Sequence, residues 1–245
     1  MNALATVGRF GLFVATVARA TATHRPPVLA SIEEAYKIGV RSLPILLIIS
    51  TFVGTNLALQ GYNAFKPLGG QSLVGMFVAL AGVREMAPIM VASMVAAKAG
   101  TEMASQIAVM RIREQIDALE VMAVNPHWYL VTPRFAGILL VIPALTILSV
   151  FTLLLSSYSV SVFQLGLNGD EFLSYVQQTM SMMDFVYTSI KSLVFGAIIC
   201  LVSCFYGFYS KPGADGVGAA TNSSVVVSAV LCASLNYLLS EILYG

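Results

Sequence analysis

Long stretches of this sequence carry no charged residue, and they recur along the whole chain. They cover residues 42–65, 67–83, 135–169, 192–210 and 216–240. Each is close to or above the roughly 20 residues that a helix needs to cross the hydrocarbon of a bilayer. The stretches are apolar all round, whereas the helices of a water-soluble bundle keep one polar face. The pattern therefore predicts an all-α integral membrane protein.

Five transmembrane helices are expected, at about 42–65, 69–108, 134–165, 186–210 and 217–243. The second and third are longer than one straight crossing requires. Pro88 lies within the second, where we expect a kink or a re-entrant break, and Pro143 could act in the same way within the third. Before the first span, Pro26 and Pro27 break the chain, and a short helix capped near Ser31 is expected to follow.

The first 22 residues partly resemble a signal peptide, because residues 10–18 are largely apolar and an Ala-Thr-Ala run follows. A helical wheel favours another interpretation. Leu4, Val7, Gly11 and Val14 share one side, and Arg9, Thr16 and Arg19 share the other. This arrangement predicts an N-terminal helix that lies in the membrane interface.

The positions of Lys and Arg predict the orientation, because cytoplasmic loops retain basic residues. One side of the membrane holds Arg9, Arg19, Arg25, Lys37, Arg41, Arg111, Arg113, Arg134 and Lys211. The other side holds Lys66 as its one basic residue, together with Asp170, Glu171 and Asp184. The N-terminus is therefore expected in the cytoplasm and the C-terminus outside.

Composition narrows the possible functions. Hydrophobic residues make up 58% of the chain and charged residues 10%, against about 25% charged in an average soluble domain. The formal net charge of +1 gives no footprint for nucleic acid. Cys200, Cys204 and Cys232 lie in apolar stretches without metal-ligand spacing, and His24 and His127 lie outside the expected spans. We expect no metal, no cofactor and no catalytic site on this chain.

The charged segment 111–126, RIREQIDALEVMAVNP, separates the second and third spans. Ile112, Ile116 and Leu119 repeat at helical spacing, while Glu114, Asp117 and Glu120 or Val121 mark the other face. A solvated connector would explain the charges. An apolar stripe would instead need a surface to bury it, either the membrane interface or a partner protein. The pattern alone leaves both interpretations open.

Ionisable residues inside the expected spans are a second signal, because such groups are costly in hydrocarbon unless they are paired or wetted. Lys98 and Glu102 are four residues apart, which predicts a local ion pair. Arg84 and Glu85 point to different faces of a helix and, with Lys191, either line a cavity or form a buried network. A ridge of small residues at four-residue spacing predicts close helix packing: Ala92, Ala96, Gly100, Ala104 and Ala108.

The stretch 82–134, GVREMAPIMVASMVAAKAGTEMASQIAVMRIREQIDALEVMAVNPHWYLVTPR, closely resembles the signature of the MlaE/YrbE permease family. LQGY at 59–62, IKS at 190–192, GVGAAT at 216–221 and the ending 237–245 also resemble family positions. The resemblance implies an inner-membrane permease that forms a homodimer and binds a cytoplasmic ABC ATPase. It also implies an MCE-domain protein on the outer side, a small accessory subunit on the ATPase as a further candidate partner, and lipid, chiefly phospholipid, as substrate.

The resemblance also implies roles for particular residues. The connector resembles a coupling helix that docks into the ATPase, with polar contacts from Arg113, Glu114, Gln115, Asp117 and Glu120 and apolar contacts from Ile116, Leu119 and Met122. Arg84, Glu85 and Lys191 resemble the polar residues that line the lipid cavity in this family. Tyr62 and Phe65 are further cavity candidates because of their place at the outer end of the first span, where aromatic residues either contact acyl chains or anchor the helix at the interface. Where the family often has an acid in the last span, this chain has Asn236, with Glu241 further on. The chain lacks a GxxxxGK[ST] loop, so ATP and Mg²⁺ are expected on the partner.

Residues 1–245 are thus expected to form one permease domain, with interfacial and connecting helices at 1–41 and the transmembrane part at 42–245. The predicted function is that of the membrane subunit, not itself an enzyme, of an ATP-driven lipid transporter in the inner membrane. The alternative is an ion-coupled secondary transporter of a hydrophobic substrate. That class would need titrating residues on the transport path and no ATPase, and the cytoplasmic connector helix argues against it.

Overall fold

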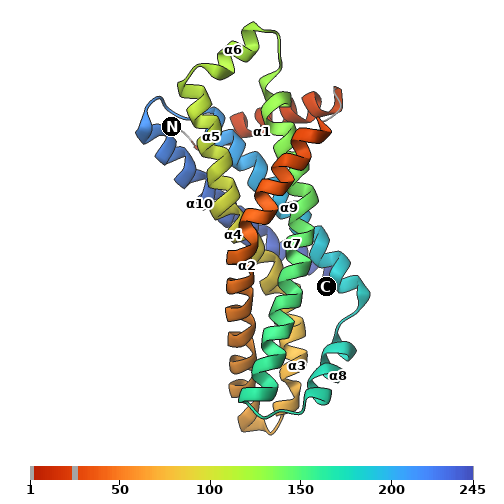
Figure 1. The fold of residues 1–245 in the computed structure, drawn as a ribbon. Coiled ribbons are helices and arrows are strands. Elements are labelled where there is room, and N and C mark those ends of the chain that lie inside the picture. Colours follow the sequence, from red (N-terminus) through yellow and green to blue (C-terminus); the bar gives the residue numbers. More distant parts are fainter. Residues whose placement is uncertain (1–2, 24–26, 245) are drawn as a thin grey trace. The chain divides into compact units, whose positions relative to one another are not determined.

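The computed structural model describes residues 3–23 and 27–244, which form helices and connecting turns without any strand (Figure 1). The predicted all-helical fold class is thereby confirmed. His24, Arg25 and Pro26 lie outside the described residues. In chain order the elements are α1 (Ala3–Thr23), α2 (Val28–Phe65), η1 (Lys66–Leu68), η2 (Gln71–Leu73), α3 (Val74–Phe77), η3 (Val78–Met86), α4 (Ala87–Val95), η4 (Ala96–Gly100), α5 (Thr101–Ile112), α6 (Gln115–Val121), η5 (His127–Val131), α7 (Thr132–Ser159), η6 (Val160–Gln164), α8 (Gly169–Thr179), α9 (Met182–Phe208) and α10 (Ala214–Tyr244).

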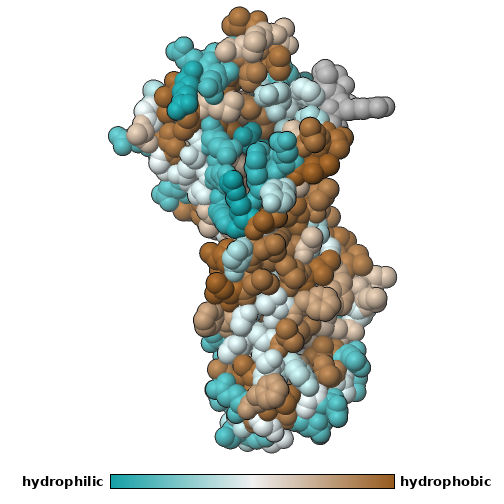
Figure 2. All heavy atoms as spheres, viewed as in Figure 1, coloured by the Kyte–Doolittle hydropathy of each residue, from teal (hydrophilic) through white to brown (hydrophobic). Residues whose placement is uncertain are grey.

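Five helical stretches are long and apolar enough to cross a membrane, as the sequence predicts. They are Val28–Leu68, Gln71–Ile112, His127–Gln164, Met182–Phe208 and Ala214–Tyr244. Apolar residues also cover much of the surface in view in Figure 2. A soluble protein rarely exposes so much contiguous apolar surface. Surface and sequence therefore agree on a multi-pass membrane protein.

The first spanning helix begins earlier than the sequence predicts. A separate short helix capped at Ser31 was expected, but α2 runs without a break from Val28 to Phe65. The Ser31 amide and hydroxyl both donate to the Pro27 carbonyl, each at 3.0 Å, so Ser31 already lies within the first turn. Helix α2 begins directly after Pro27 and continues past Ser31 into the first span. The short helix expected near Ser31 is therefore the first part of α2 and not a separate element.

The second span stays helical through Pro88, so the re-entrant break considered from the sequence is not found. The helix is instead more loosely wound on either side of α4. A π-helical segment, η3, immediately precedes α4, and a second one, η4, follows it. Such turns accommodate positions where the regular ladder of backbone hydrogen bonds is interrupted. Pro88 is the second residue of α4 and supplies that interruption. Pro143 likewise lies inside α7 without ending it.

Contacts divide the chain into two compact units. The first unit comprises Met1–Arg41, Ser93–Val141 and Phe195–Cys232. The second unit comprises Ser42–Ala92, Ile142–Val194 and Ala233–Gly245. The expectation of one permease domain stays a prediction.

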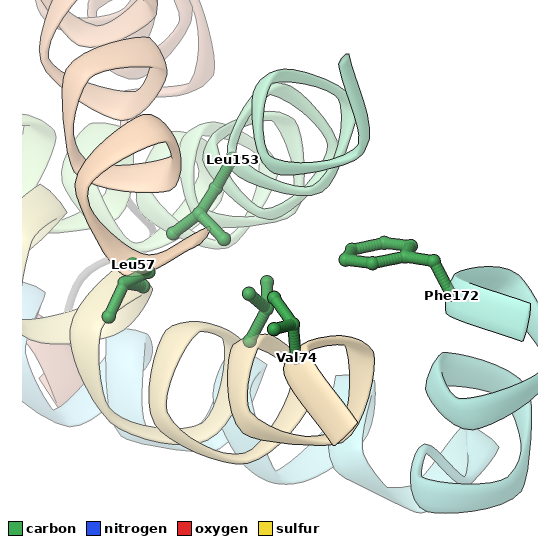
Figure 3. Close-up of a cluster of buried hydrophobic side chains, with 5 residues drawn as sticks. Leu57, Val74, Leu153 and Phe172 are labelled. Carbon is green, nitrogen blue, oxygen red and sulfur yellow. The ribbon is translucent and has the colours of Figure 1, made fainter. Parts of the chain in front are cut away.

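The second unit has an apolar core between four helices. Leu57 of α2, Val74 of α3, Leu153 of α7 and Phe172 of α8 are buried and point toward one another (Figure 3). Short α3 can pack against α8 because Gly75 leaves room for the backbone of Phe172; a side chain there would meet the Phe172 carbonyl oxygen at 2.5 Å. Helix α8, which the sequence pattern did not predict, thus completes this core.

Polar side chains join α2 to α7 within the second unit. The hydroxyls of Ser50 and Ser149 lie 2.9 Å apart, and the Ser157 hydroxyl donates to the Gly54 carbonyl at 2.8 Å. Small residues let the two helices approach, and hydrogen bonds of this kind hold helices together in lipid. A methyl group on Gly54 would collide with the backbone of Leu153.

In the first unit, α1 packs through an aromatic face. Phe13 is 2% exposed and its ring contacts those of His127, Phe205 and Phe208 at centroid distances of 5.3, 5.7 and 5.6 Å. Val7 and Gly11, which the helical wheel placed on one apolar side, are exposed. The helix is confirmed, but the protein buries the face around Phe13. A position of the exposed face in the membrane interface stays a prediction.

The ridge of small residues packs as predicted where it crosses the first unit. A side chain at Gly100 would meet the Ser203 hydroxyl at 2.9 Å, and one at Gly207 would meet the Ala104 carbonyl at the same distance. Helix α9 therefore lies against α5 at backbone separation. The hydroxyls of Ser203 and Ser224, 2.8 Å apart, then join α9 to α10.

Candidate functional site

Two residues with left-handed backbone conformation set α6 apart from the segments on either side. Glu114 precedes the helix and Ala123 follows it, each with φ of 58°. Residues other than glycine adopt this conformation rarely, and at Glu114 it turns the chain sharply between α5 and α6 (Figure 1). Arg111 at the end of α5 pairs with Asp117 on α6, with Nη1 and Oδ1 2.6 Å apart. The connector is thus a distinct short helix.

The predicted coupling residues of α6 differ in exposure. Arg113, Glu114, Gln115, Asp117 and Glu120 are all exposed. Of the predicted apolar contacts, Ile116 is 1% exposed, Leu119 is half-buried and Met122 is 64% exposed. Ile116 therefore anchors α6 to its own chain and offers a partner no surface.

Sequence reasoning missed the most exposed apolar residue of the connector. Val121 is 88% exposed at the last position of α6. Its place on the wheel put it with the acidic residues, because a 3.6-residue period assumes that the helix continues. The helix ends at Val121, however, and the next residue, Met122, is also exposed, so the two adjacent residues form an exposed apolar tip at the end of α6. No periodic signal could have found this tip.

In the second unit, Lys191 of α9 is fully buried and uses all three of its donors. Its Nζ donates to the Arg84 carbonyl at 2.9 Å, to Glu85 Oε1 at 3.1 Å and to the Ser240 hydroxyl at 2.7 Å. An ammonium group has three protons to donate, so its hydrogen bonding is complete. Three elements, η3, α9 and α10, therefore meet at one charge.

Glu85 balances this charge. Its carboxylate also accepts hydrogen bonds from Asn236 Nδ2 at 2.8 Å and from the Ser240 hydroxyl at 2.8 Å. An acidic residue at position 236 would face Glu85, and the two carboxylates would repel each other. The Asn236 amide donates a hydrogen bond to Glu85 instead, so the network holds one carboxylate, and Lys191 alone neutralises it. The side chain of Glu85 is 36% exposed, whereas Lys191 behind it is 0% exposed.

Pro88 explains why Lys191 reaches a backbone oxygen. Proline has no N–H, so it cannot donate to a carbonyl one helical turn earlier. Arg84 and Val83 lie four and five residues before Pro88. Their carbonyls accept from Lys191 at 2.9 Å and from the Thr188 hydroxyl at 3.4 Å. Helix α9 thus supplies donors at the turn where proline removes one.

Arg84 points away from Glu85, as predicted, and binds Asp184. Nε and Nη2 lie 2.9 and 3.3 Å from the two carboxylate oxygens, and the guanidinium lies 4.8 Å from the ring centroid of Tyr244. Asp184 was expected in the outer loop, but it lies in the first turn of α9 and is 3% exposed. Its carboxylate also caps the helix, because the Ser181 amide donates to Asp184 Oδ2 at 2.7 Å, while the Ser181 hydroxyl accepts from the Met183 amide at 3.0 Å.

The predicted pair of Lys98 and Glu102 is wrong. Glu102 instead pairs with Arg41 of α2 at 3.0 Å, and Lys98 donates to the Arg41 carbonyl. Lys98 lies in the π-helical turn η4, where the wider winding shifts residues four apart away from a common face. Both charges therefore turn to α2 within the first unit.

Tyr62 and Phe65 pack with the apolar core of the second unit. Tyr62 lies against the cluster around Leu57, beneath Lys66, whose Nζ is 5.3 Å from the ring centroid. The ring of Phe65 meets that of Phe77 edge-on at 6.1 Å. Both aromatic side chains are half-buried. Of the five predicted cavity residues, only Arg84, Glu85 and Lys191 share one network.

These features define a class: a multi-pass helical membrane protein whose second and third spans are joined by a short exposed helix, with a charged network between its helices. The pattern of the family described as "Permease MlaE" matches residues 31–242, and the chain belongs to that family. It is therefore an ABC transporter permease.

Curated relatives agree. A "Probable ABC transporter permease protein" of Rickettsia felis is 36% identical over 97% of this chain and 92% of its own length. Another protein so described, from Synechocystis, is 34% identical over 87% of this chain and 81% of its own. The "Protein TRIGALACTOSYLDIACYLGLYCEROL 1, chloroplastic" of Arabidopsis thaliana is 33% identical over 87% of this chain and 61% of its own.

Proposed function

We propose that this chain is the membrane subunit of an ATP-driven transporter whose substrate is lipid, most simply phospholipid. The observation that carries the proposal is the family match over residues 31–242. The Arabidopsis relative is named for a galactosylated diacylglycerol, which supports lipid as the substrate class. The exposed helix α6 supports a soluble partner on the side where the basic loops lie.

In this proposal, α6 docks into a cytoplasmic ABC ATPase. The tip formed by Val121 and Met122 would enter an apolar groove, while Arg113, Gln115 and Glu120 would form the polar rim that is typical of interfaces. ATP and Mg²⁺ would bind to the partner, because the chain has no GxxxxGK[ST] loop. Ile116 and the Arg111–Asp117 ion pair would transmit movement of the tip to α5, since both hold α6 to its own chain.

Two copies of the chain would enclose the lipid. Glu85 is the most suitable charged residue for the cavity wall, because its carboxylate is part exposed while Lys191 holds it from behind. Arg84, Tyr62 and Phe65 are further proposed contacts. The remaining proposed partners are an MCE-domain protein on the outer side and a small accessory subunit on the ATPase. The protein would reside in the inner membrane, with its N-terminus in the cytoplasm.

Reconstitution tests this function. The chain and its ATPase would be placed in liposomes that contain a fluorescent phospholipid, and lipid transfer to an acceptor would be followed with and without ATP. Transfer that requires ATP and the ATPase, and that ionophores do not alter, is the expected result. Transfer that proceeds without the ATPase and stops when ion gradients are collapsed would identify an ion-coupled carrier instead.

A further inference from the structure

A cavity of about 230 Å³ lies in the first unit between the beginning of α2 and the beginning of the third span. Pro27, Glu33 and Glu34 line one side, and Tyr129, Leu130 and Arg134 line the other. The two walls are fixed, because a side chain at Gly137 of α7 would already meet the backbone of Ser31 and Ala35 at about 3 Å. The cavity is therefore a built feature of helix packing.

Arg134 brings an uncompensated positive charge to this cavity. Arg134 is 8% exposed. Its guanidinium donates to two neutral acceptors, the Leu130 carbonyl at 2.6 Å and Gln106 Oε1 at 3.0 Å. Its Nε has no hydrogen-bond partner, and no carboxylate among residues 3–23 and 27–244 forms an ion pair with it. Buried arginines are ordinarily paired with an anion.

A negative charge lines the opposite wall. Glu34 is neutralised by Lys37 at 3.1 Å, but Glu33 is exposed and forms no ion pair within the described part of the chain. The cavity thus holds one free charge of each sign. A simple anion would be repelled by Glu33 and a simple cation by Arg134, whereas a molecule with both charges satisfies both walls.

The position of the cavity in the chain favours a lipid headgroup as the molecule with both charges. It lies at the beginning of the third apolar stretch, His127–Gln164, and is lined by Trp128 and the half-exposed Tyr129. Aromatic residues of this kind mark the headgroup level of a bilayer. Its volume equals that of about eight water molecules in the liquid. A phosphate joined to a two-carbon amine contains a similar number of non-hydrogen atoms.

We propose that this cavity binds the zwitterionic headgroup of a phospholipid from the leaflet on the basic side, with phosphate at Arg134 and amine at Glu33. The proposal depends on the chain spanning a bilayer and not on the ATPase or on transport. The lipid bound here is a fixed partner of the α2–α7 junction, separate from any lipid that passes Glu85.

The chain supplies its own reporter for this site. Trp128 is the single tryptophan of the sequence and lines the cavity. The purified full chain in detergent would be titrated with short-chain phosphatidylethanolamine, phosphatidylcholine and phosphatidylglycerol, and with free O-phosphoethanolamine, while Trp128 fluorescence is recorded. Lipid that binds at the network around Lys191 lies outside the cavity that Trp128 lines.

We expect saturable changes with both zwitterionic lipids, with phosphatidylglycerol roughly tenfold weaker, as for the loss of one charge-assisted hydrogen bond. Glu33→Gln should weaken zwitterion binding and strengthen phosphatidylglycerol binding, which would erase the preference. The matched control Glu241→Gln, an exposed carboxylate on α10, should leave the order unchanged.

Arg134→Gln should abolish the response to all three lipids, and its circular dichroism would show whether it folds; Glu33→Gln decides the question if it does not. Equal affinity for the three lipids in the unaltered chain, or no effect of Glu33→Gln, would overturn the proposal. Saturation by free O-phosphoethanolamine at the same concentrations would overturn a lipid as the occupant.

Discussion

The ammonium group of Lys191 lies 2.9 Å from the carbonyl oxygen of Arg84, four residues before a proline that has no N–H to donate to it. One buried lysine thus donates the hydrogen bond that the Arg84 carbonyl cannot receive from the proline, and it neutralises Glu85 on the same helical turn. This double use explains how a charge can remain in the middle of a spanning helix, where an unpaired one would cost several kcal/mol. It also predicts what happens when the charge is removed.

Lys191→Met keeps the length of the side chain but leaves Glu85 without its cation. Breaking a buried pair in this way costs about 3 kcal/mol or more, so we expect a lower unfolding temperature of the purified chain in detergent. Lys191→Arg, which keeps the charge but not the shape, should lose less. Unchanged thermal stability of Lys191→Met would show that the network does not hold η3 to α9.

Glu85→Gln changes the exposed member of the same pair. The amide can still accept from Lys191 and Ser240, but the fully buried Lys191 loses its anion, so we expect a lower unfolding temperature than that of the unaltered chain. Lipid transport per assembled complex should fall further, because the wall of the proposed cavity loses its charge. Transport rate in liposomes and the yield of assembled complex would be compared. If complex yield falls in parallel with transport, the residue acts in packing alone.

Gly54 should tolerate no side chain. Gly54→Ala pushes a methyl group into the Leu153 backbone and breaks the contact between α2 and α7; overpacking of this kind costs about 1–3 kcal/mol. Gly218→Ala on α10 meets nothing within 4 Å and should be neutral or slightly stabilising, because alanine favours helix. Unfolding temperatures of the two variants would be compared, and equal values would contradict the close packing.

The proposed orientation predicts which loops face outward. Asp170 and Asn125 are both exposed, so cysteines placed there should differ only in the compartment they face. In intact cells a membrane-impermeant thiol reagent should label Asp170→Cys and spare Asn125→Cys. Native Cys200, Cys204 and Cys232 are buried and would first be replaced by alanine. Labelling of Asn125→Cys without labelling of Asp170→Cys would show that the orientation in the membrane is the opposite of the proposed one.

The spans could be predicted from sequence because hydrocarbon imposes a continuous apolar requirement over about 20 residues. Helix α8 escaped prediction because it is short and amphipathic, and its one buried aromatic, Phe172, gives no periodic signal. The network around Lys191 was predicted only in part. Arg84, Glu85 and Lys191 stand out as charges, whereas Ser240 joins them only through the meeting of η3, α9 and α10, which no local pattern encodes.

Asp184 and Lys98 show the same limit. The charge of Asp184 suggests a solvent-exposed loop. Its hydrogen bond from the Ser181 amide and its ion pair with Arg84 compensate for the loss of water on burial. Lys98 was paired by regular helical spacing, which the π-helical turn changes. The interrupted helix thus accounts for the error at Lys98, since spacing arguments assume an ideal helix, whereas the error at Asp184 arose because its buried partners come from distant parts of the sequence and from the helix cap.

If α6 couples this permease to an ATPase, a charge introduced at Val121 should break the complex. Because Val121 is 88% exposed, Val121→Asp should leave insertion and folding intact. If the tip docks into an apolar groove, the new carboxylate loses its water, and affinity for the ATPase should fall by about thirtyfold or more. Leu119→Asp, on a half-buried position of the same helix, should act likewise, and Glu120→Gln should be mild. The measurement is the amount of ATPase that co-purifies with each variant per permease. We expect near-complete loss of the ATPase from Val121→Asp and near-normal stoichiometry with Glu120→Gln. Full retention of the ATPase by both Val121→Asp and Leu119→Asp would show that α6 does not dock into an ATPase.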